Sequence, residues 1–319
     1  MRILVTGAGG FVGATLIDRL LPEPHLQLRA AVRDKDRSLP EGVDIIAVGN
    51  IGDDTDWRSA LKGVDVVVHL AARVHVMKDS DADPLAAFRA TNRDGTLRLA
   101  EAMVREGCRR LIFVSTAKVM GEVTVRGMPF TSASNPAPAD PYACSKWEAE
   151  QGLRMLQQAG ALECVVIRPP LVYGPGVGAN FLAMMRWLDR RWPLPLGSVR
   201  NRRTLVAAAN LADLITVCLG HPAASGRVFL AGDAESLSTP DLLHKLGCAL
   251  ERPPRLFSVP DGALRLAAAV AGKQRWYDRL CGSLELDISA TCSTLGWSPP
   301  VSVDTALKVT ATHYRKMQR

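Results

Sequence analysis

The chain has 319 residues, enough for about two compact domains or one large one. Hydrophobic residues make up 47% and charged residues 22%, which predicts a folded core and excludes a broadly disordered chain. Lys and Arg total 39 against 32 Asp and Glu, a net charge of +7, which favours an anionic partner; a small phosphorylated ligand explains this as well as nucleic acid does, and no basic run resembles a nucleic-acid-binding tail.

The first half of the chain alternates short apolar runs with helix-compatible segments. Several runs are almost unbroken apolar, as expected for parallel strands that helices cover on both faces. The predicted strands are Arg2–Thr6, Gln27–Val32, Asp44–Val48, Asp65–Leu70, Leu111–Ser115 and Cys164–Arg168. The predicted helices are Phe11–Leu21, Asp54–Leu61, Pro84–Glu106 and Pro141–Ala159. This alternation predicts an α/β fold with a Rossmann-like, doubly wound parallel sheet.

The rhythm changes at Gly174, where Pro- and Gly-rich turns and arginine-bearing loops begin. We therefore predict a dinucleotide-binding domain over residues 1–173 and a smaller substrate lobe over 174–319, some of whose segments could return to the sheet. The apolar stretch from Leu264 to Ala271 is too short to cross a bilayer and is expected to form a core helix.

A glycine loop follows the first predicted strand directly. Residues 6–13 read TGAGGFVG, with Gly7, Gly10 and Gly13 opening the first helix. Glycine permits the tight turn, the approach of backbone NH groups to a pyrophosphate and close packing of the helix on the strand. The positive end of the helix dipole adds to the attraction for phosphate, so the loop predicts a dinucleotide site.

The end of the second predicted strand bears on the choice of cofactor. Arg33 follows Val32 and suits a 2′-phosphate, which favours NADP(H) over NAD(H). Asp34 could instead bind the ribose of NAD(H) if the strand ends one residue later. A solvated strand-end charge is the third interpretation of Arg33.

Tyr142 and Lys146 stand four residues apart at the start of a predicted helix that Asp140 caps and Pro141 opens. They share a face, where an ammonium and a cationic nicotinamide would stabilise the phenolate and lower the tyrosine pKa from about 10. Such a phenol could exchange a proton with a sugar oxygen. Thr116 or Ser115, at the carboxyl edge of the sheet, could hydrogen-bond that oxygen.

These motifs together resemble the extended short-chain dehydrogenase/reductase family, specifically its NAD(P)-dependent nucleotide-sugar epimerases, dehydratases and reductases. Beside the glycine loop, the chain carries an HxAA strand end at 69–72, NRDGT from Asn92, and RPP with YGPG between 168 and 176. The resemblance runs along nearly the whole chain.

The resemblance implies roles for individual residues. Thr116, Tyr142 and Lys146 would form the catalytic triad, and a UDP-sugar would be the substrate, its diphosphate bound by Asn180, Arg203 and, with less support, Arg279. The implied cofactor-binding residues are Gly7, Gly10, Phe11, Val12, Gly13, Arg33, Asn50, Ile51, Leu70, Ala71, Ala72, Asn92, Tyr142, Lys146 and Pro169.

The reaction is narrowed by the residues that follow Thr116. The family's 4,6-dehydratases carry an Asp-Glu pair there, whereas this chain has Ala117 and Lys118, so the acid and base for elimination are missing. A finer resemblance, carried by residues 145–150, 168–177 and 195–203, is to the O-antigen reductases. It implies a 4-ketoreductase of a UDP-4-keto-6-deoxy-N-acetylhexosamine, in O-antigen or polysaccharide precursor synthesis. The alternatives are a UDP-hexose or UDP-N-acetylhexosamine 4-epimerase with tightly bound NAD, and a non-catalytic cofactor-sensing protein.

The remaining expectations are general. Seven scattered cysteines without a CxxC pair favour reduced thiols, and no residues have metal-ligand spacing. Without a signal peptide or a long apolar run, the expected location is the cytoplasm, with no membrane insertion. The resemblance implies a possible homodimer. His75 could touch the sugar, although a lone histidine more often packs or faces solvent.

Overall fold

The computed structural model describes residues 1–34, 39–74 and 83–318 and has a seven-stranded parallel sheet at its centre. The strands lie in the order β10-β6-β5-β4-β1-β2-β3. Their bounds are β1 Arg2–Thr6, β2 Gln27–Val32, β3 Val43–Ala47, β4 Val66–His69, β5 Arg110–Val114, β6 Glu163–Arg168 and β10 Val228–Leu230. The reversal of strand order beside β1 opens a crevice at the carboxyl edge of the sheet, where ligands of this fold class bind.

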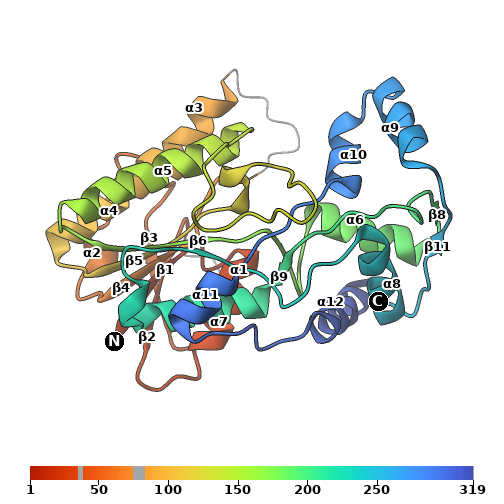
Figure 1. The fold of residues 1–319 in the computed structure, drawn as a ribbon. Coiled ribbons are helices and arrows are strands. Elements are labelled where there is room, and N and C mark those ends of the chain that lie inside the picture. The colour runs from red at the N-terminus through yellow and green to blue at the C-terminus, as the bar shows by residue number, and fades with distance from the viewer. Residues whose placement is uncertain (35–38, 75–82, 319) are drawn as a thin grey trace.

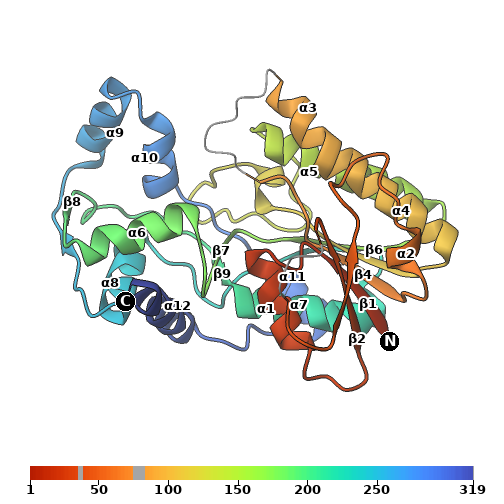
Figure 2. The same cartoon turned by 180° about the vertical axis from the view of Figure 1, so that it is seen from behind.

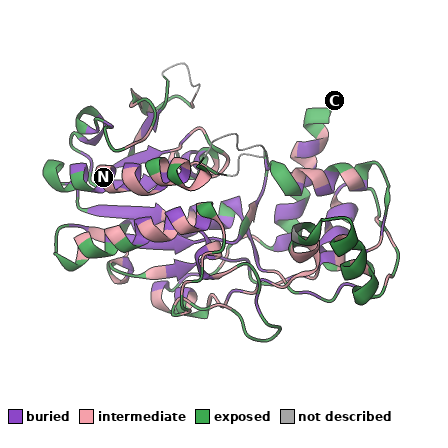
Figure 3. Ribbon diagram, turned by 90° about the horizontal axis from the view of Figure 1, so that it is seen from above, coloured by how far each residue is buried: buried purple, intermediate pink, exposed green. Residues whose placement is uncertain are grey.

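Helices cover both faces of the sheet, as Figures 1 and 2 show. On one face are α2 (Arg58–Leu61), α3 (Pro84–Arg89), α4 (Gly95–Glu106) and α5 (Pro141–Gln158); on the other are α1 (Phe11–Leu20), α7 (Ala208–Gly220) and α11 (Ser289–Leu295). Most of the strands are buried on both sides (Figure 3), which explains their unbroken apolar sequence, whereas the edge strand β3 is only partly buried. The predicted Rossmann-like sheet is confirmed.

The C-terminal lobe packs around a core of its own. It contains β7 (Leu171–Tyr173), α6 (Ala179–Asp189), β8 (Pro193–Leu194), β9 (Leu205–Ala207), α8 (Thr239–Ala249), β11 (Arg255–Leu256), α9 (Asp261–Val270), α10 (Gln274–Cys281) and α12 (Val303–Gln318). The chain crosses between the lobes more than once, because β10 pairs with β6 in the main sheet while α8 and α12 pack together in the C-terminal lobe.

Two predicted helices differ from the observed ones in informative ways. The segment predicted as Asp54–Leu61 is helical only from Arg58. The segment predicted as Pro84–Glu106 is interrupted by one π-helical turn, Ala90–Asp94, which inserts an extra residue into the helix and changes the direction of the side chains there.

The expectation that Leu264 to Ala271 forms a core helix is wrong. The helix forms as α9, but none of its residues is buried, and Leu266 is 66% and Val270 82% exposed. Figure 3 shows this hairpin of α9 and α10 as largely exposed. Apolar composition alone misled the prediction, because the core of the lobe is already filled by α6, α8 and α12. Among the described residues, no helix has the length and apolar character to cross a bilayer.

Candidate active site

The glycine loop makes the tight turn that its sequence predicts. Gly7 has φ +69°, a conformation that favours glycine, and its carbonyl accepts a hydrogen bond from the NH of Gly10 at 2.9 Å. A Cβ on Gly7 would lie 2.7 Å from the amide nitrogen of Ala71, and one on Gly13 only 2.2 Å from the carbonyl oxygen of Gly7. The loop therefore lies directly against the end of β4 and against its own helix.

A chain of buried hydrogen bonds links this loop to the start of α5. The Thr6 hydroxyl contacts His69 Nδ1 at 2.7 Å, and His69 Nε2 contacts the Thr96 hydroxyl at 3.0 Å. Thr96 donates to the carbonyl of Asn92 at 2.7 Å, and the Asn92 amide donates to the Ser145 hydroxyl at 3.0 Å. Burial and the nearby ammonium of Lys146 lower the pKa of His69 to about 3, so this histidine is neutral.

Asn92 is held inside the π-helical turn between α3 and α4. Its side chain is fully buried, accepts from the NH of Arg73 at 2.8 Å and donates to the carbonyl of the same residue at 3.0 Å. A π-turn is often found at functional sites because it redirects one side chain. Here it turns an amide inward, toward the segment after β4 and toward α5.

Tyr142 and Lys146 lie one turn apart at the start of α5, as predicted. Asp140 caps this helix by accepting from the NH of Ala143 at 2.7 Å. The rings of Tyr142 and Phe88 of α3 form a T-shaped pair, with 6.1 Å between ring centres. Lys146 is 1% exposed, with its Nζ 4.0 Å from the centre of the Phe113 ring.

Burial moves both pKa values, and for Tyr142 in the direction opposite to our expectation. Burial, with the Asp140 carboxylate, raises the pKa of Tyr142, so this phenol is a protonated donor at neutral pH. Burial lowers the pKa of Lys146 to about 7, and Glu150 one turn further along opposes that shift. Lys146 is thus a cation that gives up its proton easily.

The structure distinguishes Thr116 from Ser115, which the sequence left open. The Ser115 hydroxyl is committed to Glu150, whose carboxylate also pairs with Arg168 at 2.6 Å inside the protein. Thr116 caps the 3₁₀ turn Ala117–Met120, and its Oγ1 accepts from the NH of Lys118 at 3.3 Å. Thr116 is therefore the better candidate to contact a reacting oxygen.

The remaining predicted cofactor residues lie around the carboxyl edge of the sheet with varied exposure. Arg33, Asp34 and Asn50 are exposed just after their strands, and Ile51 packs toward Gly95 of α4. Phe11, Val12 and the segment Leu70, Ala71 and Ala72 are partly buried, and Pro169 is buried with its carbonyl accepting from the NH of Ala117 at 2.8 Å.

The predicted diphosphate residues lie in the C-terminal lobe. The guanidinium of Arg203 is largely buried, which lowers its pKa, and donates to the carbonyl of Gly282 at 2.9 Å. A desolvated cation bound to a carbonyl rather than to a carboxylate is suited to receive an anion. Asn180 is exposed in the first turn of α6, and Arg279 is exposed on α10.

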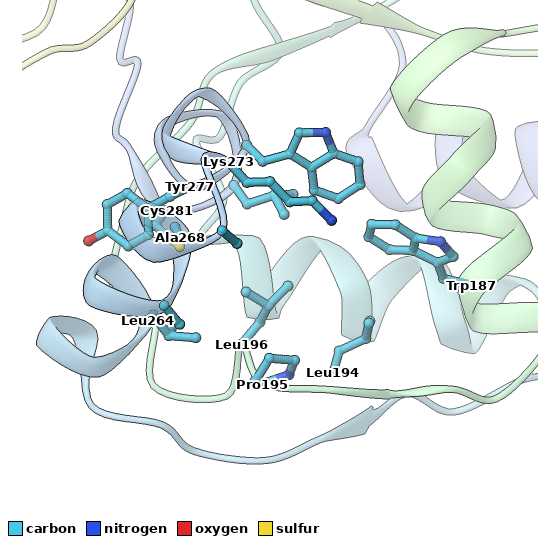
Figure 4. A pocket seen from close by; sticks show the side chains of 13 residues that line it. Trp187, Leu194, Pro195, Leu196, Leu264, Ala268, Lys273, Tyr277 and Cys281 are labelled. Carbon is cyan, nitrogen blue, oxygen red and sulfur yellow. The ribbon is translucent and has the colours of Figure 1, made fainter.

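An apolar cavity of about 290 Å³ in this lobe escaped the sequence analysis. Figure 4 shows Trp187 of α6 across from α10, with Leu194, Pro195 and Leu196 below and Lys273 above. The ring centres of Trp187 and Trp276 are 5.2 Å apart. Leu280 and Cys281 complete the wall and lead directly to Gly282, the partner of Arg203. No sequence spacing signals this cavity, because four separate segments form it.

His75 lies outside the described residues. Lys118, which the sequence showed only as a departure from the dehydratase pattern, forms an ion pair with Asp140 beside Tyr142.

Known proteins resemble the chain along its whole length. A family model for the NAD dependent epimerase/dehydratase family matches residues 3–232. A UDP-glucose 4-epimerase of Vibrio cholerae is 43% identical over 97% of this chain and 94% of its own length. The crystal structure of the Bacillus cereus UDP-glucuronic acid 4-epimerase in complex with NAD covers 100% of both chains with a TM-score of 0.79 at 21% identity. The UDP-glucose 4-epimerase of Thermotoga maritima with UDP-glucose also covers 100% of both chains, with a TM-score of 0.77 at 24% identity.

Proposed function

Since the chain belongs to the NAD dependent epimerase/dehydratase family, we propose that it is an NAD-dependent UDP-hexose 4-epimerase. The observation that carries this proposal is the 43% identity, over 97% of the chain, to the UDP-glucose 4-epimerase of Vibrio cholerae. It favours epimerisation, our alternative from the sequence, over the 4-ketoreductase that we expected first.

The residues at the carboxyl edge suit acid-base chemistry at a sugar oxygen. A nicotinamide cofactor held by the glycine loop would supply reversible hydride transfer at sugar C4, in turn on each face of the sugar. The Tyr142 phenol would move the proton at the C4 oxygen, and the Thr116 hydroxyl would hold that oxygen in place. The Lys146 ammonium, held over the Phe113 ring, would favour the phenolate when it forms.

The glycine loop fits the pyrophosphate of a dinucleotide. Gly7 and Gly13 pack too closely against the protein's own backbone to leave room for a Cβ, while Gly10 is exposed at the N-terminus of α1, where backbone NH groups can face a phosphate. We propose NAD rather than the NADP(H) that Arg33 favoured. The support is that the Bacillus cereus neighbour was solved with NAD, while Arg33 and Asp34 are both exposed after β2.

We propose that the cavity between α6 and α10 takes the nucleobase of the UDP-sugar. Trp187 and Trp276 offer flat apolar surfaces to a base, and the wall of the cavity leads to Gly282, which holds Arg203. A base in the cavity would bring the diphosphate toward Arg203. Asn180 and Arg279 are further candidates for the same phosphates.

The central experiment follows both the sugar and the cofactor. Purified protein is incubated with UDP-glucose or UDP-N-acetylglucosamine and NAD, and the galacto product is measured by chromatography while absorbance at the nicotinamide band is recorded. A 4-epimerase forms the product with no net change in reduced cofactor. Absence of any galacto product from either sugar would contradict the proposal.

A 4-ketoreductase is the second candidate, because exposed Arg33 remains available to an exchangeable phosphorylated cofactor. Its signature is the loss of one NADPH per molecule of a UDP-4-keto-6-deoxy-N-acetylhexosamine. Elimination of water is not proposed, because Ala117 is buried and apolar and Lys118 is cationic. A cofactor-sensing protein without catalysis would leave every one of these substrates unchanged.

A further inference from the structure

Lys118 and Asp140 form an ion pair between the two segments that carry Thr116 and Tyr142. Lys118 Nζ lies 2.5 Å from Asp140 Oδ2. Lys118 belongs to the 3₁₀ turn that Thr116 caps, and Asp140 is the N-cap of α5, two residues before Tyr142. The pair therefore spans the end of β5 and the start of the helix with the reactive phenol.

The two carboxylate oxygens of Asp140 have separate partners. Oδ1 accepts from the NH of Ala143 at 2.7 Å and caps the helix, while Oδ2 meets the ammonium of Lys118. The side chains of Lys118 and Asp140 are only 26% and 20% exposed, so solvent screens this pair less than an exposed one. A backbone bond reinforces the link, because the NH of Ala137 donates to the carbonyl of Val119 at 2.8 Å.

The charge of Asp140 acts on Tyr142. Its carboxylate adds to the effect of burial and raises the pKa of the phenol. The ammonium of Lys118, bound to that carboxylate, offsets its field, and Glu122 shares the ammonium at 3.3 Å.

The other charged groups on the elements packed around the phenol are largely paired or stacked. Arg89 of α3 pairs with Glu148 of α5. In the segment after β4, Arg73 lies over the Phe88 ring with 5.5 Å to its centre. Beyond Lys118, Glu122 and Asp140, the titratable groups on these neighbouring elements include Arg73, Asp83, Arg89, Arg93, Asp94, Cys144, Lys146, Glu148 and Glu150.

We propose that Lys118 is a positioning residue that holds the turn after β5 against the start of α5 and neutralises the helix-capping carboxylate two residues before the reactive phenol. The inference rests on the acid-base role proposed for Tyr142. Lys118 is not itself an acid or base in the reaction, because its ammonium acts on Tyr142 through Asp140.

The test compares four variants in the pH dependence of kcat/KM with a UDP-hexose. Lys118→Gln leaves the Asp140 charge unpaired, so the acid limb of the kcat/KM profile should move to higher pH. At pH values below this limb kcat/KM should fall about 3- to 10-fold, and above it kcat/KM should change little. Asp140→Asn keeps the helix cap, because Asn caps as well as Asp, and should move the limb to lower pH. The double variant should return the limb close to that of the unmodified enzyme, and Lys118→Arg should preserve it.

A second measurement does not depend on turnover. Tyrosines labelled with ¹³C at Cζ are titrated by NMR in the NAD-saturated protein, and the Tyr142 signal is assigned by its loss in Tyr142→Phe. The Tyr142 phenol should lose its proton at the lowest pH in Asp140→Asn and at the highest pH in Lys118→Gln. If the three proteins titrate alike, or if the variants lower activity equally at every pH, the pair is a structural surface contact and the proposal is wrong. An enzyme inactive on UDP-hexoses but with shifted titrations would instead overturn the proposed function alone.

Discussion

Tyr142 and Lys146 illustrate how burial sets the chemistry of single residues. They share one face of α5, yet the phenol holds its proton more firmly than usual while the amine holds its proton less firmly. Both shifts follow from desolvation, which disfavours whichever form carries the charge. The pair is therefore poised as a neutral phenol beside a readily titrated ammonium.

Replacing Tyr142 by Phe should remove the proton donor and leave the packing against Phe88 in place. We expect kcat to fall about 10²- to 10⁴-fold, which is the usual contribution of a general acid or base. Turnover is measured with saturating UDP-hexose, and the fold is checked by thermal unfolding. Tyr314→Phe, in α12 of the other lobe, is the control and should retain activity. Full activity in Tyr142→Phe would refute its acid-base role.

The lowered pKa of Lys146 predicts how the free energy of unfolding depends on pH. Its pKa of about 7 lies below the ordinary 10.5, so between these values the unfolded chain binds a proton that the folded protein does not. The free energy of unfolding should therefore rise with pH from about 7 to 10.5 relative to Lys146→Met, with a slope of at most about 1.4 kcal/mol per pH unit. Urea unfolding at several pH values measures this difference.

The matched control for that series is Lys245→Met. An ion pair with Asp304 raises the pKa of Lys245. The contribution of Lys245 to the free energy of unfolding is therefore fully present below its ordinary pKa and should be constant between pH 7 and 10. A flat difference for Lys146→Met as well would show that its amine keeps an ordinary pKa.

At the scale of elements, the glycine loop and α1 depend on contact distances that allow no side chain. Gly13→Ala would place a Cβ 2.2 Å from the carbonyl oxygen of Gly7, so the helix must shift away from the strand. We expect a loss of stability of about 1–3 kcal/mol and weaker NAD binding, because overpacking displaces the loop. Chemical unfolding and a cofactor titration measure the two effects.

Gly220→Ala is the control for this substitution. No atom lies within 4 Å of a Cβ at Gly220, which ends α7. It should leave stability unchanged or raise it slightly, since alanine has the higher helix propensity. Equal behaviour of the two variants would argue that the close packing at Gly13 is not needed.

At the scale of the whole molecule, stability is unevenly distributed between the sheet and the α9–α10 hairpin. The sheet is buried under helices on both faces, whereas α9 buries no residue. Segments with few buried contacts open locally at low free-energy cost. We therefore expect the amides of α9 and α10 to exchange with solvent faster than those of the central strands.

UDP should slow this exchange if the cavity takes the nucleobase. Binding would stabilise the closed hairpin, because Leu264, Trp276 and Leu280 line the cavity. Hydrogen exchange followed by mass spectrometry, with and without UDP, measures the protection, and inorganic pyrophosphate is the control ligand without a base. Protection by both ligands alike would place the binding energy at the phosphates, and unchanged exchange with UDP would exclude the cavity as the base site.

The sequence by itself determined the elements whose signals are local. The unbroken apolar runs predicted the strands, TGAGGFVG predicted the turn that its glycine contacts require, and Asp140 with Pro141 fixed the start of α5. Each of these depends on neighbouring residues in the chain, so spacing and residue type are sufficient. The family resemblance then indicated which residues share the carboxyl edge, although their roles stay predictions.

Only the tertiary structure decided the features that join distant segments. Only in the structure does Ser115 hydrogen-bond to Glu150 and Lys118 pair with Asp140. The π-turn at Asn92 and the exposure of α9, whose composition predicted burial, are also visible only there. The tertiary structure also formed the apolar cavity from α6, the β8 region, α9 and α10. Burial and charge pairing depend on what packs against a residue in space, and no local pattern in the sequence carries that information.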